Sequence, residues 1–260
     1  MELSKKAAIF YHGIFGYPLT LEELEKWKVG KKGLSEIEKN ISSPKLKNDF
    51  RERKLRGKIS EEKIKIARKA ANLLEKIPTV KGIFLTGALA MKNADENSDI
   101  DLMIVTKRNS LWTTRLLVYG LLRVAGYELR KPKDNDQKDK LCLNIWLDNS
   151  ALSWDKKDRN IYSAHEIAQV VPIVDKENIC QRFLQKNRWI LDYWPNSVRI
   201  EDTKYKIKGN VNTNNLLERI SFWIQYKYMV KKITREKIGL HKAIFHPRNW
   251  GEVVLRKLST

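Results

Sequence analysis

Two aspartates, Asp99 and Asp101, lie one residue apart in an otherwise apolar segment, SDIDLMIVT (98–106). A buried carboxylate is strongly destabilising unless it is paired or bound to a metal. In a strand, alternate side chains share a face, so we expect both carboxylates on the side of Met103. Like charges that close repel unless a cation lies between them, and oxygen ligands suit Mg²⁺ or Mn²⁺. The pair therefore predicts a metal site, where two such ions can clamp a phosphoryl group.

A second chemical feature precedes the acid pair by a dozen residues. The turn Thr86-Gly87-Ala88 follows an apolar run and opens a short helix. Free backbone N–H groups at a helix N-terminus bind phosphate, and glycine lets the backbone approach it closely. An anion site and a metal site, both at strand ends, together predict phosphate-transfer chemistry.

An α+β arrangement of strands and helices is expected to position these two features. The expected elements are a helix over 60–77, strands over 80–85 and 99–106, a helix over 110–125, and strands over 127–131 and 141–147. Ser60 is the expected cap of the first helix, and Pro78 lies just beyond its end. The apolar face of this helix must pack on the sheet that follows it.

The turn and the acid pair together, FLTGALA…SDIDLMIV, resemble the signature of the nucleotidyltransferase superfamily that includes DNA polymerase beta. That signature is a Gly-Ser turn, a spacer, and Asp-x-Asp on a strand. The resemblance covers residues 80–106 in detail and the element order through about 150. It implies a mixed-sheet core with flanking helices, an NTP substrate and two Mg²⁺ (or Mn²⁺) ions. It also implies that Asp99 and Asp101 are catalytic metal ligands, and that Gly87 and Ala88 contact the triphosphate.

The chain departs from the family's pattern in the turn, where serine usually follows glycine and its hydroxyl helps to hold a phosphate. Here the residue is Ala88, and Thr86 or Ser98 is the candidate replacement for that hydroxyl. Arg115, on the helix after the acid pair, is a further candidate contact for the triphosphate. The expected nucleotide-binding residues are therefore Thr86, Gly87, Ala88, Ser98 and Arg115.

A second departure concerns the third carboxylate, which members of the family usually carry on a later strand. There it binds the catalytic metal or deprotonates the acceptor. The polar residue of the corresponding strand, LCLNIWL, is Asn144. An amide oxygen can ligate a metal weakly but cannot act as a base. Asn144 is expected in the catalytic site. The nearest carboxylates in the sequence are Asp139 and Asp148. Either one of these two acts as the third carboxylate, or catalysis is slow or absent.

His165 and Glu166, in YSAHEIAQ, begin like a zinc-protease motif. Gln169 stands where the second histidine of His-Glu-x-x-His would lie, so a zinc-protease site is excluded. We expect His165 to be a surface or helix-capping residue, and a helical histidine beside the nucleotide pocket is the alternative.

The segments on either side of the core predict two further units. Residues 1–58 contain three short helices, one of them with Thr20 and Glu23 in capping-box spacing. They indicate a winged-helix-like module with a basic linker at its end, and a small helical cap is the alternative. The nucleotidyltransferase core is expected over 59–150, and a C-terminal helical region over 151–260.

The formal net charge of +20 is concentrated in the flanks. Residues 1–78 carry a net +8, residues 79–173 only +2, and residues 174–260 a net +10. Basic flanks are either a solvated surface or a binding surface for a polyanion, of which nucleic acid is the first candidate. The basic residues from Lys227 to Lys237 are expected along one amphipathic helix, where phosphate contacts would position a nucleic acid.

The sequence contains no run of about 18 apolar residues and no recognisable signal peptide, so no membrane partner is expected. Its two cysteines, Cys142 and Cys180, lack metal-ligand spacing and are expected to be reduced. These observations favour a cytoplasmic protein.

The leading hypothesis is a metal-dependent nucleotidyltransferase that moves a nucleotidyl group from an NTP to an acceptor. The basic flanks favour a nucleic acid, RNA or a tRNA-like end, over a small molecule. Two alternatives stay open. The first is a nucleic-acid-binding regulator with an inactive transferase core, which Ala88 and Asn144 favour. The second is a transferase that modifies a protein partner.

Overall fold

The structure of the protein is a computed structural model that describes residues 2–37, 50–131, 134, 136–202, 215–230, 236–245 and 250–259. Its α-helices are α1 (Leu3–Gly13), α2 (Leu21–Lys26), α3 (Lys31–Ile37), α4 (Phe50–Leu74), α5 (Gly87–Ala90), α6 (Leu111–Val124), α7 (Ile161–Ala168), α8 (Ile179–Lys186), α9 (Leu216–Met229) and α10 (Trp250–Ser259). Short 3₁₀ helices are η1 (Lys156–Asp158), η2 (Lys176–Asn178) and η3 (Arg188–Asp192). None of the helices within the described residues combines the length and apolar character that crossing a bilayer needs.

The strands form one mixed sheet. They are β1 (Val80–Leu85), β2 (Ile100–Thr106), β3 (Leu141–Asp148), β4 (Val171–Asp175), β5 (Lys237–Ile238) and β6 (Lys242–Ile244). Their order across the sheet is β4-β1-β2-β3-β6-β5. Strands β2 and β3 are parallel, and the other neighbouring pairs are antiparallel. The expected α+β fold with a mixed sheet and flanking helices is confirmed.

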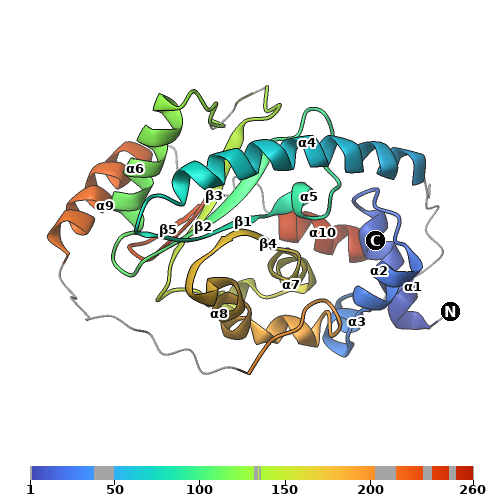
Figure 1. Cartoon of the computed structure of the whole chain (residues 1–260). Coiled ribbons are helices and arrows are strands. Elements are labelled where there is room, and N and C mark those ends of the chain that lie inside the picture. The colour runs from blue at the N-terminus through green and yellow to red at the C-terminus, as the bar shows by residue number, and fades with distance from the viewer. Residues whose placement is uncertain are drawn as a thin grey trace.

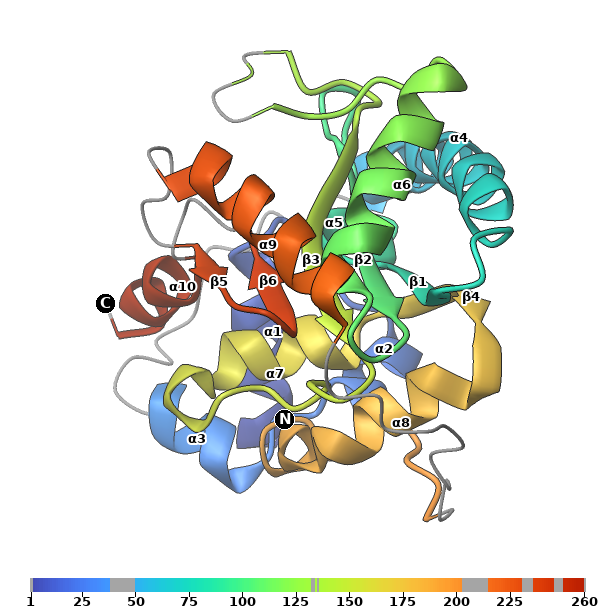
Figure 2. The same ribbon diagram turned by 90° about the vertical axis from the view of Figure 1, so that its left-hand side faces the viewer.

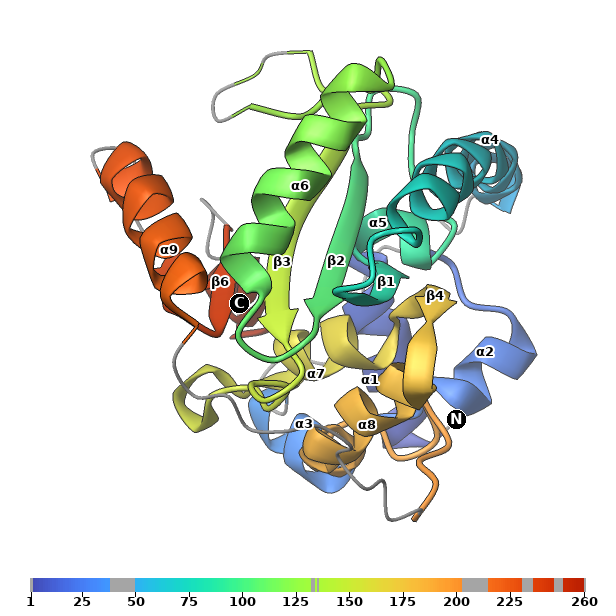
Figure 3. The same ribbon diagram turned by 60° about the vertical axis from the view of Figure 1, so that its left-hand side comes forward.

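The alternation of side chains along β2 separates two hydrophobic cores. Ile100, Leu102 and Ile104 face the core that contains α4 and α6. Met103 faces the other core, with α1, α7, α8 and α10. Figure 3 shows α6 crossing over β2 and β3 with α4 beside it, and Figure 1 shows α7 and α8 on the opposite side of the sheet from α4. Asp101 shares the face of Met103, so its carboxylate points toward the helices of the second core.

The N-terminal helices α1, α2 and α3 pack on the second core, where Tyr11 and Trp27 are buried. The capping box of Thr20 and Glu23 at the start of α2 is confirmed. Helix α3 contacts α10 and η3, so these helices are continuous with the C-terminal part of the molecule. No strand occurs among the described residues of 1–58. The winged-helix interpretation is therefore not confirmed.

Helix α4 begins earlier than expected. Residues 50–58, expected as part of a basic linker, form its first turns. They are helical because Arg53 anchors them to α2, where its two terminal nitrogens each donate to a Glu23 carboxylate oxygen at 2.7 Å. Ser60, the expected cap, lies inside the helix and accepts a hydrogen bond from the loop after α5. The preceding part of the expected linker, within residues 38–49, lies outside the described residues.

Three strands come from residues 151–260, which were expected to be helical. Strand β4 pairs with β1, and β6 pairs with β3. These strands have two to five residues, too few to show an alternating pattern in the sequence. The same region contains helices α7, α8 and α9, as a helical region requires, and α9 packs along α6 (Figure 2). The division of the chain at residues 58 and 150 stays a prediction.

The basic stretch after residue 226 does not form the single helix that was expected. Lys227 is exposed on α9, which ends at Met229, and Lys237 lies on β5, where it pairs with Asp158. Outside the described residues lie Lys231, Lys232 and Arg235.

The strand expected over 127–131 is reduced to one bridge between Leu129 and Leu141. The backbone N–H of Arg130 donates to the Leu141 carbonyl at 3.0 Å, so this segment runs beside the start of β3. The bridge matters for the site because it places the Arg130 side chain near the acid pair.

Candidate active site

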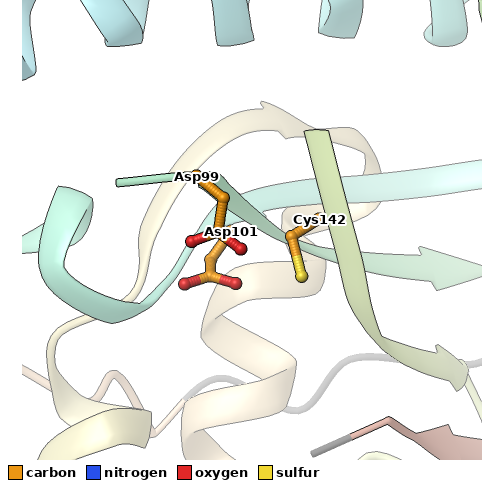
Figure 4. A group of neighbouring side chains, drawn as sticks. All are labelled: Asp99, Asp101 and Cys142. Atoms are coloured by element: carbon orange, nitrogen blue, oxygen red, sulfur yellow. The ribbon is translucent and has the colours of Figure 1, made fainter. Parts of the chain in front are cut away.

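The acid pair lies where β2 begins and runs parallel to β3. Asp101, on β2, is opposite Cys142 on β3, and Asp99 directly precedes β2. Figure 4 shows the two carboxylates close together, with the Cys142 thiol beside them. One oxygen of each carboxylate and the thiol sulfur lie within 4.8 Å of one another. The two acids therefore converge as the strand period predicts.

Asp99 is paired with a cation of the protein itself. Arg130 Nη1 donates to Asp99 Oδ2 at 2.6 Å, and the Asp99 side chain is only 12% exposed. Because the bridge beside β3 fixes the backbone of Arg130, the guanidinium is held at the edge of the acid pair. It offsets part of the negative charge there.

Asp101 is held by the polar residue of the neighbouring strand. Asn144 Nδ2 donates to Asp101 Oδ1 at 2.6 Å, so the amide expected at the third-carboxylate position orients this acid. Burial, and then the charge of Asp99, raises the pKa of Asp101, while a hydrogen bond from Cys142 opposes this. A nearby divalent cation favours the ionised form of a carboxylate and would lower that pKa.

Cys142 contacts the site but lacks the chemistry of a ligand. Burial, and then the charges of Asp101 and Asp99, raises the pKa of its thiol far above the usual range. The thiol therefore stays protonated, and hard cations prefer oxygen ligands in any case. Cys142 is better described as a weak hydrogen-bond donor to Asp101 than as a metal ligand.

The turn before α5 requires glycine for two reasons. Gly87 has a φ of +59°, in the left-handed region that favours glycine. A Cβ at this position would also lie 2.5 Å from Asp101 Oδ2, which is a clash. The backbone N–H of Thr86 donates to the Asp101 carbonyl at 3.1 Å and fixes the turn against β2. The space beside the Asp101 carboxylate is thus kept open by the backbone.

Two buried oxygens in this region, Thr86 Oγ1 and Asn144 Oδ1, have no hydrogen-bond partner among the described residues. Buried polar atoms are normally satisfied, so such atoms indicate a missing ligand. Beside two carboxylates, they complete a set of oxygen donors that suits a hard divalent cation, and the Thr86 hydroxyl can also donate to a phosphate. The residues present therefore fit a divalent cation together with a nucleotide.

A cleft of about 940 Å³ contains both the acid pair and the turn. Of the predicted site residues, it is lined by Thr86, Gly87, Ala88, Asp99, Asp101 and Asn144. Arg130 also lines it, and the aromatic rings of Phe15, Tyr17 and Tyr162 form part of its wall. Its volume and its combination of apolar walls with a few polar groups are typical of small-molecule sites.

Two predicted nucleotide contacts do not line this cleft. Ser98 Oγ donates to Asp95 Oδ1 at 2.8 Å within the loop before β2. Arg115 Nη1 donates to Gln225 Oε1 on α9 at 2.6 Å, and its guanidinium lies over the ring of Tyr119. The structure therefore favours Thr86 over Ser98 as the replacement for the family's serine hydroxyl.

The two substitute carboxylates considered for the third position are also engaged elsewhere. Asp139 pairs with Lys63 at 2.6 Å, and Asp148 Oδ2 lies 2.6 Å from His241 Nδ1 at the far end of β3. Neither lines the cleft. The sequence positions nearest to Asn144 thus do not supply the missing acid.

The residues of the cleft wall that were not predicted as site residues include His12, Arg130, His165 and Glu166. His165 is buried, so the expectation of a surface histidine was wrong. Its Nε2 lies 3.0 Å from His12 Nε2, in an aromatic cluster with Trp27. The available signal was a His-Glu pair inside an otherwise apolar helix; for Arg130 and His12 no local pattern existed.

The comparison with protein families agrees with this geometry. Residues 64–172 match the model of the nucleotidyltransferase domain. The chain contains a nucleotidyltransferase domain. This domain extends from α4 into β4, and it includes the acid pair, the turn, Asn144 and α7. The comparison with curated proteins returned no match.

A nucleotidyltransferase domain supports nucleotidyl transfer as the activity and implies an NTP substrate. Domains of this kind typically use divalent metals, and the two carboxylates of the acid pair lie close enough to share one.

Proposed function

We propose that the protein is a metal-dependent nucleotidyltransferase that transfers a nucleotidyl group from an NTP to a nucleic acid, RNA or a tRNA-like end. The observation that carries this proposal is the convergence of the Asp99 and Asp101 carboxylates beside the Gly87 turn, within one cleft. A metal site and a phosphate site share that cleft, as phosphoryl-group chemistry requires.

The proposed roles follow from the positions of the side chains. Asp99 and Asp101 would hold Mg²⁺ or Mn²⁺, and Asn144 would orient Asp101. When bound, the divalent cation neutralises charge on the triphosphate and stabilises charge that develops during in-line displacement.

The triphosphate would be bound mainly by the turn. Gly87 and Ala88 offer backbone N–H groups at the start of α5, and Thr86 offers a hydroxyl that no described residue hydrogen-bonds. Arg130 lines the same cleft and supplies a planar cation with the geometry that phosphate oxygens favour. Ser98 and Arg115 are no longer needed for these contacts.

A nucleic-acid acceptor is supported by charge. The net charge of +20 lies mostly in the segments before and after the core, so the domain's flanks would attract a polyanion. Phosphate contacts of this kind position a strand without reading its bases.

The first test is titration calorimetry of Mg-NTP binding. Wild-type protein is expected to bind, and Asp99→Ala is expected to weaken binding by about tenfold or more because a metal ligand is lost. Asp192→Ala, an exposed acid outside the cleft, is the matched control and should bind as wild type does. Absent affinity, or affinity unaffected by Asp99→Ala, would remove the proposal.

The acceptor is tested separately, by incorporation of labelled NTP into RNA compared with protein and small-molecule acceptors. Label in RNA is expected. Failure to extend any polynucleotide would remove the nucleic-acid part of the proposal, and label in a protein would favour the protein-modifying alternative.

A second candidate is a nucleic-acid-binding regulator with an inactive core. Two observations favour it: an amide, Asn144, stands on β3 where the family usually has a carboxylate, and Arg130 already pairs with Asp99. Binding of RNA without turnover of any NTP is the outcome that this candidate predicts.

A further inference from the structure

Glu166 lies in the wall of two neighbouring cavities. One is the 940 Å³ cleft with the acid pair, and the other, of about 580 Å³, lies beside it. The residues that line both are Thr86, Ile145, Tyr162, Glu166 and Trp250. Among these, Glu166 alone carries an ionisable carboxyl group. Glu166 therefore lies between the cleft proposed to bind the nucleotide and a second cavity to which no ligand has been attributed.

The second cavity has the composition of a site for a polar, ring-containing molecule. Its wall includes the indoles of Trp154 and Trp250 and the cationic side chain of Lys157, whereas Lys237 of the same wall is paired with Asp158. Aromatic faces stack on rings, and cations attract phosphate groups. Because Thr86 and Glu166 belong to both walls, a molecule in this cavity would lie next to the triphosphate end of the cleft.

The carboxyl group of Glu166 is oriented by its own helix. Gln169 Nε2 donates to Glu166 Oε1 at 2.7 Å, which is the only hydrogen bond that the described residues make to this group. Its other oxygen, Oε2, accepts no hydrogen bond from the described residues. Helix α7 itself is held in place by a capping box at Asn160 and by Ile161, whose N–H donates to Glu36 Oε2 at 2.9 Å.

Glu166 also interacts electrostatically with the acid pair. Burial, and then the charge of Asp101, raises the pKa of Glu166 to about 8. The two carboxyl groups are thus close enough to influence each other across the cleft. A carboxyl group with high proton affinity, near the operating pH, has the property that a general base needs.

The other acids of the described cavity walls are already engaged. Asp134 pairs with Lys140 at 3.2 Å, and Asp158 pairs with Lys237. Glu252 has a partner on its own helix, Arg256, at 3.7 Å. Asp99 and Asp101 form the proposed cation site. By elimination among the described residues, Glu166 is the carboxyl group available for proton transfer.

We propose that Glu166 is the general base of the reaction and accepts the proton of the acceptor's hydroxyl group, held in the 580 Å³ cavity. This inference rests on the proposed nucleotidyl transfer. In the step, the acceptor oxygen forms a bond to the α-phosphorus of the NTP as its proton passes to Glu166. The bond from that phosphorus to the bridging oxygen breaks, and pyrophosphate leaves with the electron pair. Helix α7 thereby supplies the carboxylate that β3 lacks.

The test compares wild type with Glu166→Gln, which keeps the size and the contact to Gln169 but cannot accept a proton. Release of pyrophosphate from Mg-NTP is measured with RNA and with water as the acceptor, and Mg-NTP binding is measured by calorimetry. The expected result is a decrease in kcat of at least about 100-fold. The KM for NTP and the calorimetric affinity are expected to stay within about twofold of wild type. Glu62→Gln, an exposed residue on α4, is the matched control and should leave all three quantities unchanged.

A second variant keeps the proposal testable if the first is structurally perturbed. Glu166→Ala leaves room for a small acid, so added formate is expected to restore part of its pyrophosphate release. A purely structural role of Glu166 would not respond to formate.

The outcomes separate this inference from the proposed function. Wild-type kcat in Glu166→Gln, or no rescue of folded Glu166→Ala by formate, overturns the role of Glu166 alone. Loss of Mg-NTP affinity in Glu166→Gln also overturns it, because Glu166 would then belong to nucleotide binding. Wild-type protein that binds no Mg-NTP, or binds it without turnover, overturns the proposed function and this inference with it.

Discussion

At the scale of residues, the acid pair is tolerated because protein groups already offset its charges. Arg130 pairs with Asp99, and Asn144 donates to Asp101. From the sequence alone this role was expected of cations, whereas in the structure Arg130 and Asn144 contact the two carboxylates. A cation at Asp99 would bind through Oδ1 or share Oδ2 with the guanidinium, since a carboxylate has two oxygens with two lone pairs each.

The buried histidine pair beside the cleft has a defined proton arrangement. His12 Nδ1 lies 2.8 Å from the Ala8 carbonyl, which can only accept, so this nitrogen carries the proton of His12. Its Nε2 then accepts from the Nε2–H of His165 at 3.0 Å. Burial lowers the pKa of His12 to about 4 and lowers that of His165 well below its usual range. Both rings are neutral at pH 7.

This pair predicts an acid-sensitive fold. Below pH 6.5 the unfolded chain takes up a proton that folded His12 does not accept until about pH 4, so the free energy of unfolding falls as the pH falls through this window. His12 alone accounts for roughly 3 kcal/mol of this loss at pH 4. We expect His165→Gln, which keeps a donor but cannot titrate, to show a shallower decline in urea unfolding between pH 6.5 and pH 4.

The same variant provides its own control at pH 8, where both histidines are neutral in the folded and the unfolded state. The difference from wild type at that pH reports packing and hydrogen bonding only. Parallel curves for wild type and His165→Gln across the acid range would contradict the assignment.

At the scale of elements, α4 anchors the loop that leads into the acid pair. Lys63 is buried on α4, and its Nζ donates to the Ser98 carbonyl at 2.8 Å and to the Glu96 carbonyl at 3.1 Å. It also pairs with Asp139 at 2.6 Å, just before β3. One ammonium group thus joins a helix to the starts of both strands that carry the site.

We expect Lys63→Met to lower the free energy of unfolding by roughly 2 kcal/mol, because several charge-assisted hydrogen bonds are lost in a buried place. Denaturant unfolding measures this directly. Lys69→Met, at an exposed position of the same helix, is the matched control and should change stability by less than about 0.5 kcal/mol. Equal effects of the two substitutions would show that the anchor contributes nothing.

At the scale of the whole molecule, the site is assembled from segments far apart in the chain. The cleft wall takes residues from α1, from β2 and β3, from α7 and from the segment around α10. The basic charge lies mainly outside the domain matched to the family, in the flanks that complete this wall. The basic flanks would therefore attract a nucleic-acid acceptor electrostatically, whereas the core between them is nearly neutral.

This distribution predicts binding of RNA that depends on salt. If three or more phosphates are neutralised, affinity for a single-stranded RNA should fall about tenfold or more between roughly 50 and 200 mM salt. Fluorescence anisotropy at several salt concentrations measures the slope. A peptide nucleic acid of the same sequence, which lacks phosphates, is the control and should bind weakly without such a slope. Affinity for RNA that does not vary with salt would contradict the prediction.

Much of the core was predictable because its signals are local. The face shared by Asp101 and Met103 follows from the period of a strand, and the need for Gly87 follows from the turn. Strands β4, β5 and β6 were not predictable, since two to five residues show no period and pair only with distant strands. The predicted start of helix α4 was ten residues too late, because the first turns of this helix depend on a contact to α2.

The sequence by itself determined the chemistry of the centre: two carboxylates on one face of a strand, a glycine turn upstream, and the resemblance that these residues carry. Only the tertiary structure decided which groups complete it, placing Arg130, His165 and Glu166 in the same cleft and leaving Arg115 outside. The reason is physical. Periodicity and turn geometry act between neighbours in the chain, whereas burial, ion pairing and shared cavity walls arise only when distant segments pack together.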